Sequence, residues 1–180
     1  YLSWQNRKKG IVIEHRPVLA ILKEVAEVRL ELNLAQREIE RRMQAEEALR
    51  QSEEKFSLAF RTSPYAIAIT RLEDGRFIEV NDAFTSIMGF TWEEVASSSP
   101  VSLMLWVNEA DRKQVVSTLL DGGTVAGREF SFRKKNGEII DGLLSARIIH
   151  LNQGPCILSS IDDITLRKRS EAERLRLEQR

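Results

Sequence analysis

The stretch Asp74–Phe90 constrains the fold most, because it contains the signals for a tight turn, a strand and a short helix in immediate succession. Asp74-Gly75 indicates a turn between two strands, since glycine reaches the positive φ values that such turns require. Asn81 and Asp82 can cap a helix by accepting hydrogen bonds from its free N–H groups. Gly89 can end that helix in the left-handed conformation. The stretch therefore predicts a hairpin that leads directly into a helix.

Five segments of the chain have the composition of strands, and their order predicts an α+β fold. Asn136-Gly137 is a strong signal for a hairpin between two of them, and Asn108–Leu120 predicts a helix before the last three. Two strands, several short helices and three strands predict a five-stranded antiparallel sheet with helices on one face. The predicted strands are residues 65–72, 77–80, 125–134, 138–150 and 155–163.

A long N-terminal helix is predicted from Pro17, which suits the first turn of a helix. Residues 18–51 contain no proline or glycine and are mostly strong helix formers. Apolar residues recur in heptads that start at Val18, which predicts a parallel two-stranded coiled coil about 50 Å long and hence a homodimer. The pattern breaks at Arg42, and the alternative is a helix that packs against its own domain. The predicted interface consists of Val18, Ile21, Val25, Val28, Leu32 and Ile39.

Several short motifs follow one another in an order that resembles a PAS domain over about residues 53–165. The resemblance implies a sensory and dimerisation module that relays a signal to an effector, with a bacterial two-component sensor histidine kinase as the expected parent protein. The alternatives are a ligand-free spacer that only dimerises and transmits strain, or the PAS module of a diguanylate cyclase. The motifs are Ser63-Pro64-Tyr65-Ala66-Ile67, the stretch Asp74–Phe90, Thr91-Trp92-Glu93-Glu94-Val95, Lys135-Asn136-Gly137-Glu138 and Asp163-Ile164-Thr165.

The resemblance also divides the chain into four parts. Residues 1–16 are an N-terminal segment, 17–51 a coiled-coil signalling helix, 52–165 the PAS domain and 166–180 an exit helix. The exit helix is charged and resembles the connector that precedes the dimerisation helices of sensor histidine kinases. A downstream effector domain in the same polypeptide is therefore an expected partner.

The N-terminal residues allow two interpretations. Tyr1-Leu2-Ser3-Trp4 followed by Arg7-Lys8-Lys9 resembles the cytoplasmic edge of a membrane helix, and a solvated basic patch at an arbitrary chain boundary is the alternative. We expect a cytoplasmic domain, either free or as the cytoplasmic part of a membrane-anchored sensor. Lys plus Arg equals Asp plus Glu, 27 each, so the charge gives no reason to expect a nucleic-acid partner.

Catalytic and metal-binding chemistry is not expected in this chain. The histidines, His15 and His150, and the cysteine, Cys156, are too widely spaced to suggest a nucleophile–base pair or a zinc site. A small enzyme would require a carboxylate pair such as Glu129 and Asp141 in a cleft, but their expected strand positions favour two exposed side chains. The sequence contains no phosphoacceptor histidine or ATP-binding motif, so kinase activity would belong to the parent protein.

The predicted ligand site is an apolar pocket between the sheet and the helices. Light-sensing relatives carry a flavin-reactive cysteine after the central helix, and haem-binding relatives commonly use a histidine on the long helix. Residues 96–105 contain no cysteine and residues 108–120 no histidine, so covalent flavin and His-ligated haem are not expected. A small apolar ligand remains, with a solid core as the alternative, and the cofactor is unknown. The candidate lining is Ile67, Ile69, Ile78, Phe84, Ile87, Met88, Leu103, Leu105, Trp106, Phe130, Phe132, Leu143 and Ile157.

The junction Asp163-Ile164-Thr165 is the predicted signal relay. In the PAS proteins that this chain resembles, the matching motif links the last strand to the output helix. The carboxylate of Asp163 could pair with a basic residue of the next turn, within Arg167-Lys168-Arg169. The alternative is an ordinary helix cap at Asp163 or Thr165, worth about 1 kcal/mol. A cap at a hinge would allow strand movement to become helix movement.

Overall fold

The computed structural model describes residues 15–152 and 154–178. The chain divides into two units, with the boundary between Glu54 and Lys55. Tyr1–Trp4, on which the prediction of a membrane-helix edge depends, lie outside the described residues.

Helix α1 (His15–Thr62) is continuous and runs past residue 51, where the predicted coiled-coil helix ended. Arg50 supports the helix there, because it forms ion pairs with Glu47 at 2.7 Å and with Glu54 at 2.5 Å. The next helix-breaking residue is Pro64. The helix therefore continues until the first proline after its N-terminal turn.

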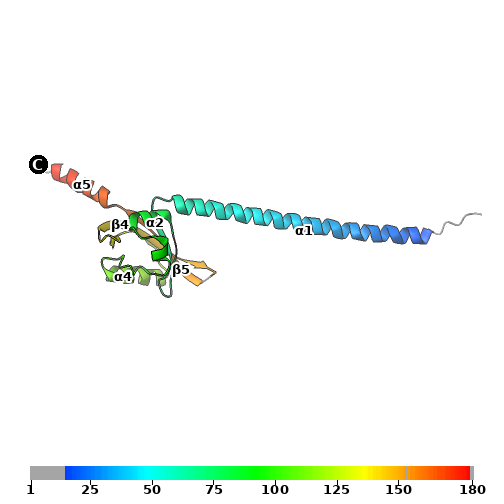
Figure 1. Cartoon of the computed structure of the whole chain (residues 1–180), viewed down its shortest axis with the longest axis horizontal. Coiled ribbons are helices and arrows are strands. Elements are labelled where there is room, and N and C mark those ends of the chain that lie inside the picture. Colours follow the sequence, from blue (N-terminus) through cyan, green and yellow to red (C-terminus); the bar gives the residue numbers. More distant parts are fainter. Residues whose placement is uncertain (1–14, 153, 179–180) are drawn as a thin grey trace, which may run out of the picture. The chain divides into compact units, whose positions relative to one another are not determined.

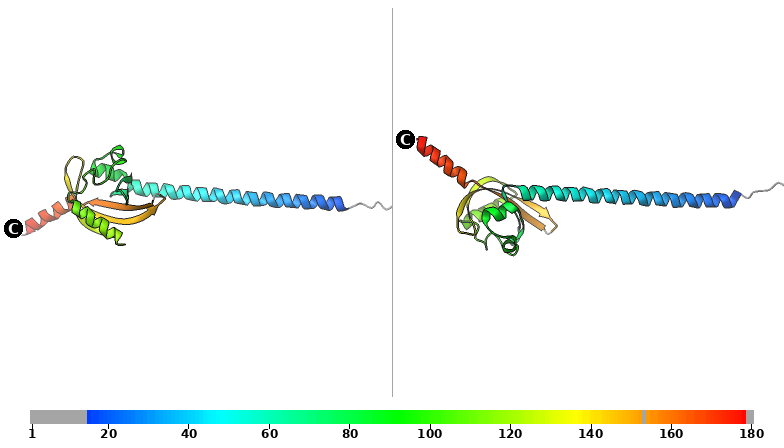
Figure 2. Two further views of the ribbon diagram at one scale, coloured as in Figure 1. Left: turned by 90° about the horizontal axis from the view of Figure 1, so that it is seen from below. Right: turned by 45° about the horizontal axis from the view of Figure 1, so that its top comes forward.

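The second unit contains the predicted five-stranded antiparallel sheet, and the α+β fold class is confirmed. The strands lie in the order β2-β1-β5-β4-β3, and β4 and β5 run side by side as the longest pair (Figure 2). The hairpins fall where Gly75 and Gly137 adopt positive φ, at 72° and 85°. The strands are β1 (Ala66–Arg71), β2 (Phe77–Val80), β3 (Val125–Arg133), β4 (Ile139–Leu151) and β5 (Gly154–Asp163).

Three helices between β2 and β3 contribute buried side chains to the core on one face of the sheet (Figure 1). Asn81, as predicted, and Asn108 cap two of them by accepting hydrogen bonds from backbone N–H groups. Gly89 ends the first helix in the left-handed conformation, with φ 80°. The helices are α2 (Asp82–Met88), α3 (Trp92–Val95) and α4 (Glu109–Leu120), and α5 (Thr165–Glu178) follows the last strand.

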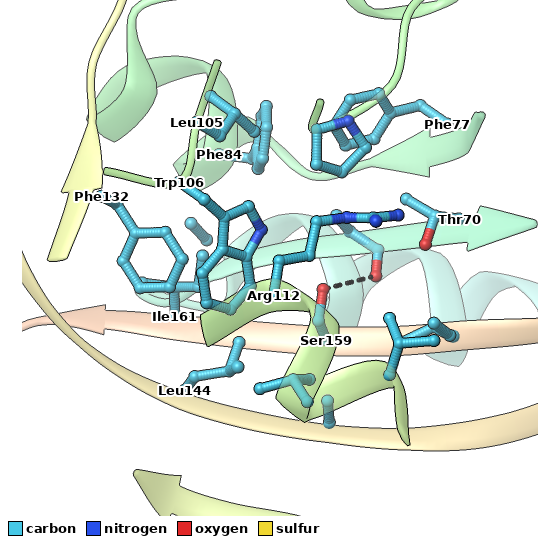
Figure 3. Close-up of a pocket in the computed structure, with 17 residues that line it drawn as sticks. Thr70, Phe77, Phe84, Leu105, Trp106, Arg112, Phe132, Leu144, Ser159 and Ile161 are labelled. Carbon is cyan, nitrogen blue, oxygen red and sulfur yellow. Dashed lines mark hydrogen bonds between the residues drawn. The ribbon is translucent and has the colours of Figure 1, made fainter. Parts of the chain in front are cut away.

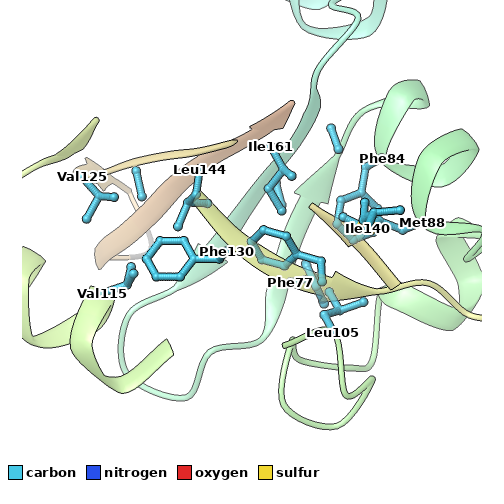
Figure 4. Close-up of a cluster of buried hydrophobic side chains, with 14 of the residues drawn as sticks. Phe77, Phe84, Met88, Leu105, Val115, Val125, Phe130, Ile140, Leu144 and Ile161 are labelled. Carbon is cyan, nitrogen blue, oxygen red and sulfur yellow. The ribbon is translucent and has the colours of Figure 1, made fainter. Parts of the chain in front are cut away.

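The core lies between the inner face of the sheet and these helices, where Phe84 and Met88 of α2 meet Ile140 of β4 (Figure 4). Phe132 of β3 belongs to the same cluster. All four side chains are almost fully buried. Burial of each such side chain contributes about 1.5–3 kcal/mol. The core therefore fixes α2 and the β3–β4 hairpin against each other.

Gly142 occupies a position on the inner face of β4 where only glycine fits. A Cβ atom there would lie 2.6 Å from Phe132 Cδ2 and 2.7 Å from Ile161 Cγ2, well inside van der Waals contact. We expect Gly142→Ala to lower the free energy of unfolding by about 1–3 kcal/mol, because the added methyl group overpacks the core. Urea unfolding followed by circular dichroism measures this loss. An unchanged midpoint would show that the two neighbours move aside freely.

Candidate functional site

A small cavity of about 70 Å³ lies between the inner face of the sheet and helix α4 (Figure 3). Strands β1, β4 and β5 form its floor, and the loop before α4 provides Leu105 and Trp106. The cavity is mostly apolar. Its lining residues are Ala66, Ala68, Thr70, Phe77, Phe84, Pro100, Leu105, Trp106, Arg112, Val115, Val116, Phe132, Leu144, Ala146, Ile157, Ser159 and Ile161.

The cavity exists because small residues meet on three neighbouring strands. Ser159 of β5 lies directly opposite Ala68 of β1 and, on its other side, opposite Ala146 of β4. All three side chains point to the inner face and line the cavity. This small-residue row, Ala68–Ser159–Ala146, leaves space above the middle of the sheet that larger side chains would fill.

Aromatic side chains form the opposite wall of the cavity. The ring centroid of Trp106 lies 4.9 Å from that of Phe132, and Phe77 and Phe84 form an edge-to-face pair with centroids 5.6 Å apart. Such pairs contribute about 0.5–1.5 kcal/mol beyond the burial of their surface. The wall is therefore held in place without a ligand.

The structure separates the predicted pocket residues into three groups. Some line the cavity, some belong to the core beside it, and some lie elsewhere. Phe84, Leu105, Trp106, Phe132 and Ile157 line the cavity. Ile87, Met88, Leu103 and Phe130 are in the core or packed against it. Ile67, Ile69, Ile78 and Leu143 belong neither to the cavity lining nor to the core cluster.

The assignment of Ile67, Ile69 and Leu143 to the pocket was wrong because of strand register. Side chains alternate between the two faces of a sheet, and the lining residues Ala68 and Leu144 occupy the adjacent inward positions. Ile67 and Leu143 are partly exposed, and Ile69 is buried outside the core cluster. These three residues therefore belong to the opposite face of the sheet.

Three polar lining residues were absent from the prediction, Thr70, Arg112 and Ser159. Helical periodicity offered a signal for Arg112, because it lies three residues before Val115 and seven before Leu119, both buried. Residues at this spacing share one face of a helix. The charge of Arg112 obscured that signal.

At the exit junction, three consecutive residues connect β5 to α5. The Asp163 carboxylate accepts a hydrogen bond from Thr165 N at 3.0 Å, so it acts as a cap. Ile164 is buried, and its N–H donates to the carbonyl oxygen of Asp141 at 2.9 Å. The Thr165 hydroxyl in turn accepts a hydrogen bond from Asp141 N, also at 2.9 Å. The start of α5 is therefore fastened to β4.

Lys168, one turn into α5, adds a second connection to the sheet. Its ammonium lies 2.9 Å from a Glu129 carboxylate oxygen and 3.7 Å from one of Asp141. The hydrogen bond to Glu129, reinforced by the charge of Asp141, raises the pKa of Lys168. The sequence suggested that a basic residue of this turn pairs with Asp163. Lys168 pairs instead with carboxylates of β3 and β4. Glu129 is exposed and Asp141 is half-buried, and Lys168 pairs with both carboxylates.

His150 and Cys156, the other residues considered for catalysis, lie on two neighbouring strands. His150 is exposed on β4, and Cys156 is a buried free thiol on β5. Among the described residues, no group of three His, Cys, Asp or Glu side chains could hold a metal ion. The same part of the chain contains no helix that is long and apolar enough to cross a membrane.

Solved PAS domains have the same fold. The PAS domain of a protein from Colwellia psychrerythraea is 25% identical, with a TM-score of 0.54, and the match covers 62% of this chain and 96% of that one. The PAS domain of an HTR-like protein from Haloarcula marismortui is 22% identical, with a TM-score of 0.53, and the match covers 68% of this chain and 99% of that one. The profile of the PAS domain family matches residues 64–166, more than half of the chain. This chain belongs to the PAS domain family.

A curated relative is the sensor histidine kinase TmoS of Ectopseudomonas mendocina, which is 30% identical over 142 residues. The match covers 77% of this chain but only 14% of that protein. The similarity therefore concerns a PAS-containing part of a much longer kinase.

Proposed function

We propose that this chain is a sensory and dimerising PAS module that relays a signal to an effector domain of the same polypeptide. The observation that carries the proposal is the exit junction. α5 begins at the end of β5, and Thr165 and Lys168 attach it to β3 and β4. A shift between these strands would change the direction of α5, and a ligand could favour one arrangement only by binding it more tightly than the other.

The dimerisation part of the proposal rests on the exposed side chains of α1. The predicted interface residues Val18, Ile21, Val25, Val28, Leu32 and Ile39 are each 51–60% exposed in the single chain. A stripe of large apolar side chains at heptad spacing is expected to be buried against a second copy of the helix. Parallel pairing would place two exit helices together at the effector.

We further propose that the effector is a histidine kinase. The similarity to TmoS supports this, because the aligned region lies within a sensor histidine kinase. A cytoplasmic location is part of the same proposal, since it would place the module beside the kinase domains it controls. The kinase activity would reside outside this chain.

The second candidate function is a ligand-free spacer. The volume of the cavity favours it, because 70 Å³ is about half of the roughly 150 Å³ of an engineered cavity that binds benzene. A spacer would use the same helices and the same junction, but it would transmit strain from an upstream domain. Binding of a small molecule to the cavity distinguishes the two functions.

Asp163→Ala tests the relay in the polypeptide that carries this chain together with its effector. We expect the isolated chain to remain folded and to lose about 1 kcal/mol of stability with the cap. Autophosphorylation should change about fivefold or more, because the start of α5 is no longer fixed. Asp162→Ala, one residue earlier on β5, is the matched control and should leave the rate unchanged. Equal autophosphorylation rates in wild type and Asp163→Ala would show that Asp163 only caps the helix and does not relay a signal.

A further inference from the structure

Arg112 is the only charged side chain among the described residues that line the cavity. It extends from α4, and its guanidinium points toward Thr70 and Phe77 (Figure 3). The end of the guanidinium approaches the β1–β2 turn, where a Cβ atom on Gly75 would lie 3.0 Å from one of its nitrogens. A positive charge thus stands at one end of a mostly apolar space.

The charge of Arg112 is not balanced by a neighbouring carboxylate in the described part of the chain, where it forms no ion pair or side-chain hydrogen bond. Glu109, on the same helix, pairs with Lys113 at 3.9 Å. Asp74, beside the β1–β2 turn, pairs with Arg71 at 2.9 Å. A partly buried guanidinium without a carboxylate favours an anionic partner, because a charged hydrogen bond in a partly dry site is stronger than a neutral one.

Thr70 provides a second polar group at the same end of the cavity. Thr70 is 7% exposed and lines the cavity, and its hydroxyl has no hydrogen-bond partner among the described residues. The other cavity hydroxyl, that of Ser159, donates to the carbonyl oxygen of Ala68 at 3.3 Å (Figure 3). Thr70 is therefore available to donate to a ligand, whereas Ser159 is already engaged.

We propose that the cavity binds a small organic monocarboxylate, whose carboxylate is held by Arg112 and Thr70 and whose hydrocarbon part lies against Phe84 and Trp106. This inference rests on the proposed sensory function and specifies its ligand class. The volume of about 70 Å³ limits the ligand. Because a cavity of roughly 150 Å³ accommodates benzene, the ligand has fewer heavy atoms than benzene, as propionate does.

Titration of the whole chain with propionate and with its neutral isostere propionamide tests the proposal. NMR follows the indole N–H signal of Trp106, assigned with Trp106→Phe. We expect saturable shifts with propionate and at least about tenfold weaker binding of propionamide, because a hydrogen bond between charged groups is worth roughly that factor. Octanoate, which is too long for the cavity, should also bind more weakly than propionate.

Variants of neighbouring residues on α4 provide the control. Arg112→Gln should weaken propionate binding about tenfold or more and leave propionamide unaffected, whereas Lys113→Gln, whose side chain lies outside the cavity, should bind propionate like the wild type. Thr70→Val should weaken propionate binding by a smaller factor. The proposal is overturned if propionate gives no saturable shift, if propionamide binds equally well, or if Arg112→Gln binds propionate normally. Light scattering tests the proposed dimer and autophosphorylation tests the proposed relay. Failure of the ligand proposal can therefore be distinguished from failure of the proposed function.

Discussion

Asn81→Ala is expected to lower the free energy of unfolding of the second unit by roughly 3–6 kcal/mol, because one buried side chain satisfies four backbone groups. Its Oδ1 accepts hydrogen bonds from Ile67 N at 2.8 Å and Phe84 N at 3.0 Å. Its Nδ2 donates to the carbonyl oxygens of Phe60 at 3.0 Å and Tyr65 at 2.9 Å. Phe84 N would keep its hydrogen bond to the backbone carbonyl oxygen of residue 81 at 3.1 Å. Alanine would leave the other three groups without this partner, each at a cost of about 1–3 kcal/mol. Urea unfolding followed by tryptophan fluorescence measures the loss.

Asn108→Ala is the matched control for this prediction. Asn108 also caps a helix, since its Oδ1 accepts a hydrogen bond from Ala110 N at 3.0 Å, but it is exposed. Its replacement should cost only about 1 kcal/mol, because water can satisfy the released N–H. If both variants lose the same stability, Asn81 acts as an ordinary cap and the role of its two donated bonds is disproved.

Val25→Lys combined with Leu32→Lys is expected to convert a dimer into a monomer. Both residues occupy predicted a positions of α1 and are 57% exposed in the single chain. In a parallel dimer, each lysine would face its own copy across the seam, so four charges would be brought into an apolar interface. Lysine itself favours helix formation, so loss of the dimer would not reflect a weaker helix. Light scattering gives the mass.

Leu30→Lys combined with Leu34→Lys provides the comparison on the same helix. Both leucines are as exposed as the seam residues, at 61% and 55%, but they fall at positions f and c of the predicted heptad. Their replacement should leave the dimer intact, because these positions face away from the partner helix. An unchanged mass in the seam variant, or equal dissociation in both variants, would rule out pairing through this stripe.

Local signals in the sequence were sufficient to predict most of the second unit. Strand β2 was predicted to the residue, and α2 has the predicted cap at Asn81 and the predicted end at Gly89. These features depend on residues a few positions apart, so they can be inferred without knowledge of the rest of the fold. The start and end of the remaining strands differ from prediction by one residue or so, as with β3, which ends at Arg133.

The lining of the cavity could be predicted only in part, because it depends on pairing between distant strands. β1 carries apolar side chains on both faces, so alternation along that strand does not reveal which face is inward. The register of Ala68 against Ser159, which lie far apart in the sequence, decides it. Bulky residues such as Ile67 were preferred in the prediction, although a cavity forms where side chains are small.

The connection between the exit helix and the sheet was also beyond the reach of sequence patterns. Asp163 was recognised as a possible cap, and the structure shows that cap. The partners of Lys168, however, are Glu129 and Asp141, which come from two earlier strands. No local spacing identifies them, since the pairing arises only when β3 and β4 lie side by side beneath the start of α5.

The row of Ala68, Ser159 and Ala146 has a consequence for how such domains diversify. Their side chains set the volume above the sheet, while their backbone groups remain in an unbroken ladder of antiparallel pairs. Exchange of one member for a larger or smaller residue would change the size of molecule admitted and leave the framework in place. Selectivity could therefore drift by single substitutions during evolution, and the same three positions offer an engineer a starting point for retuning it.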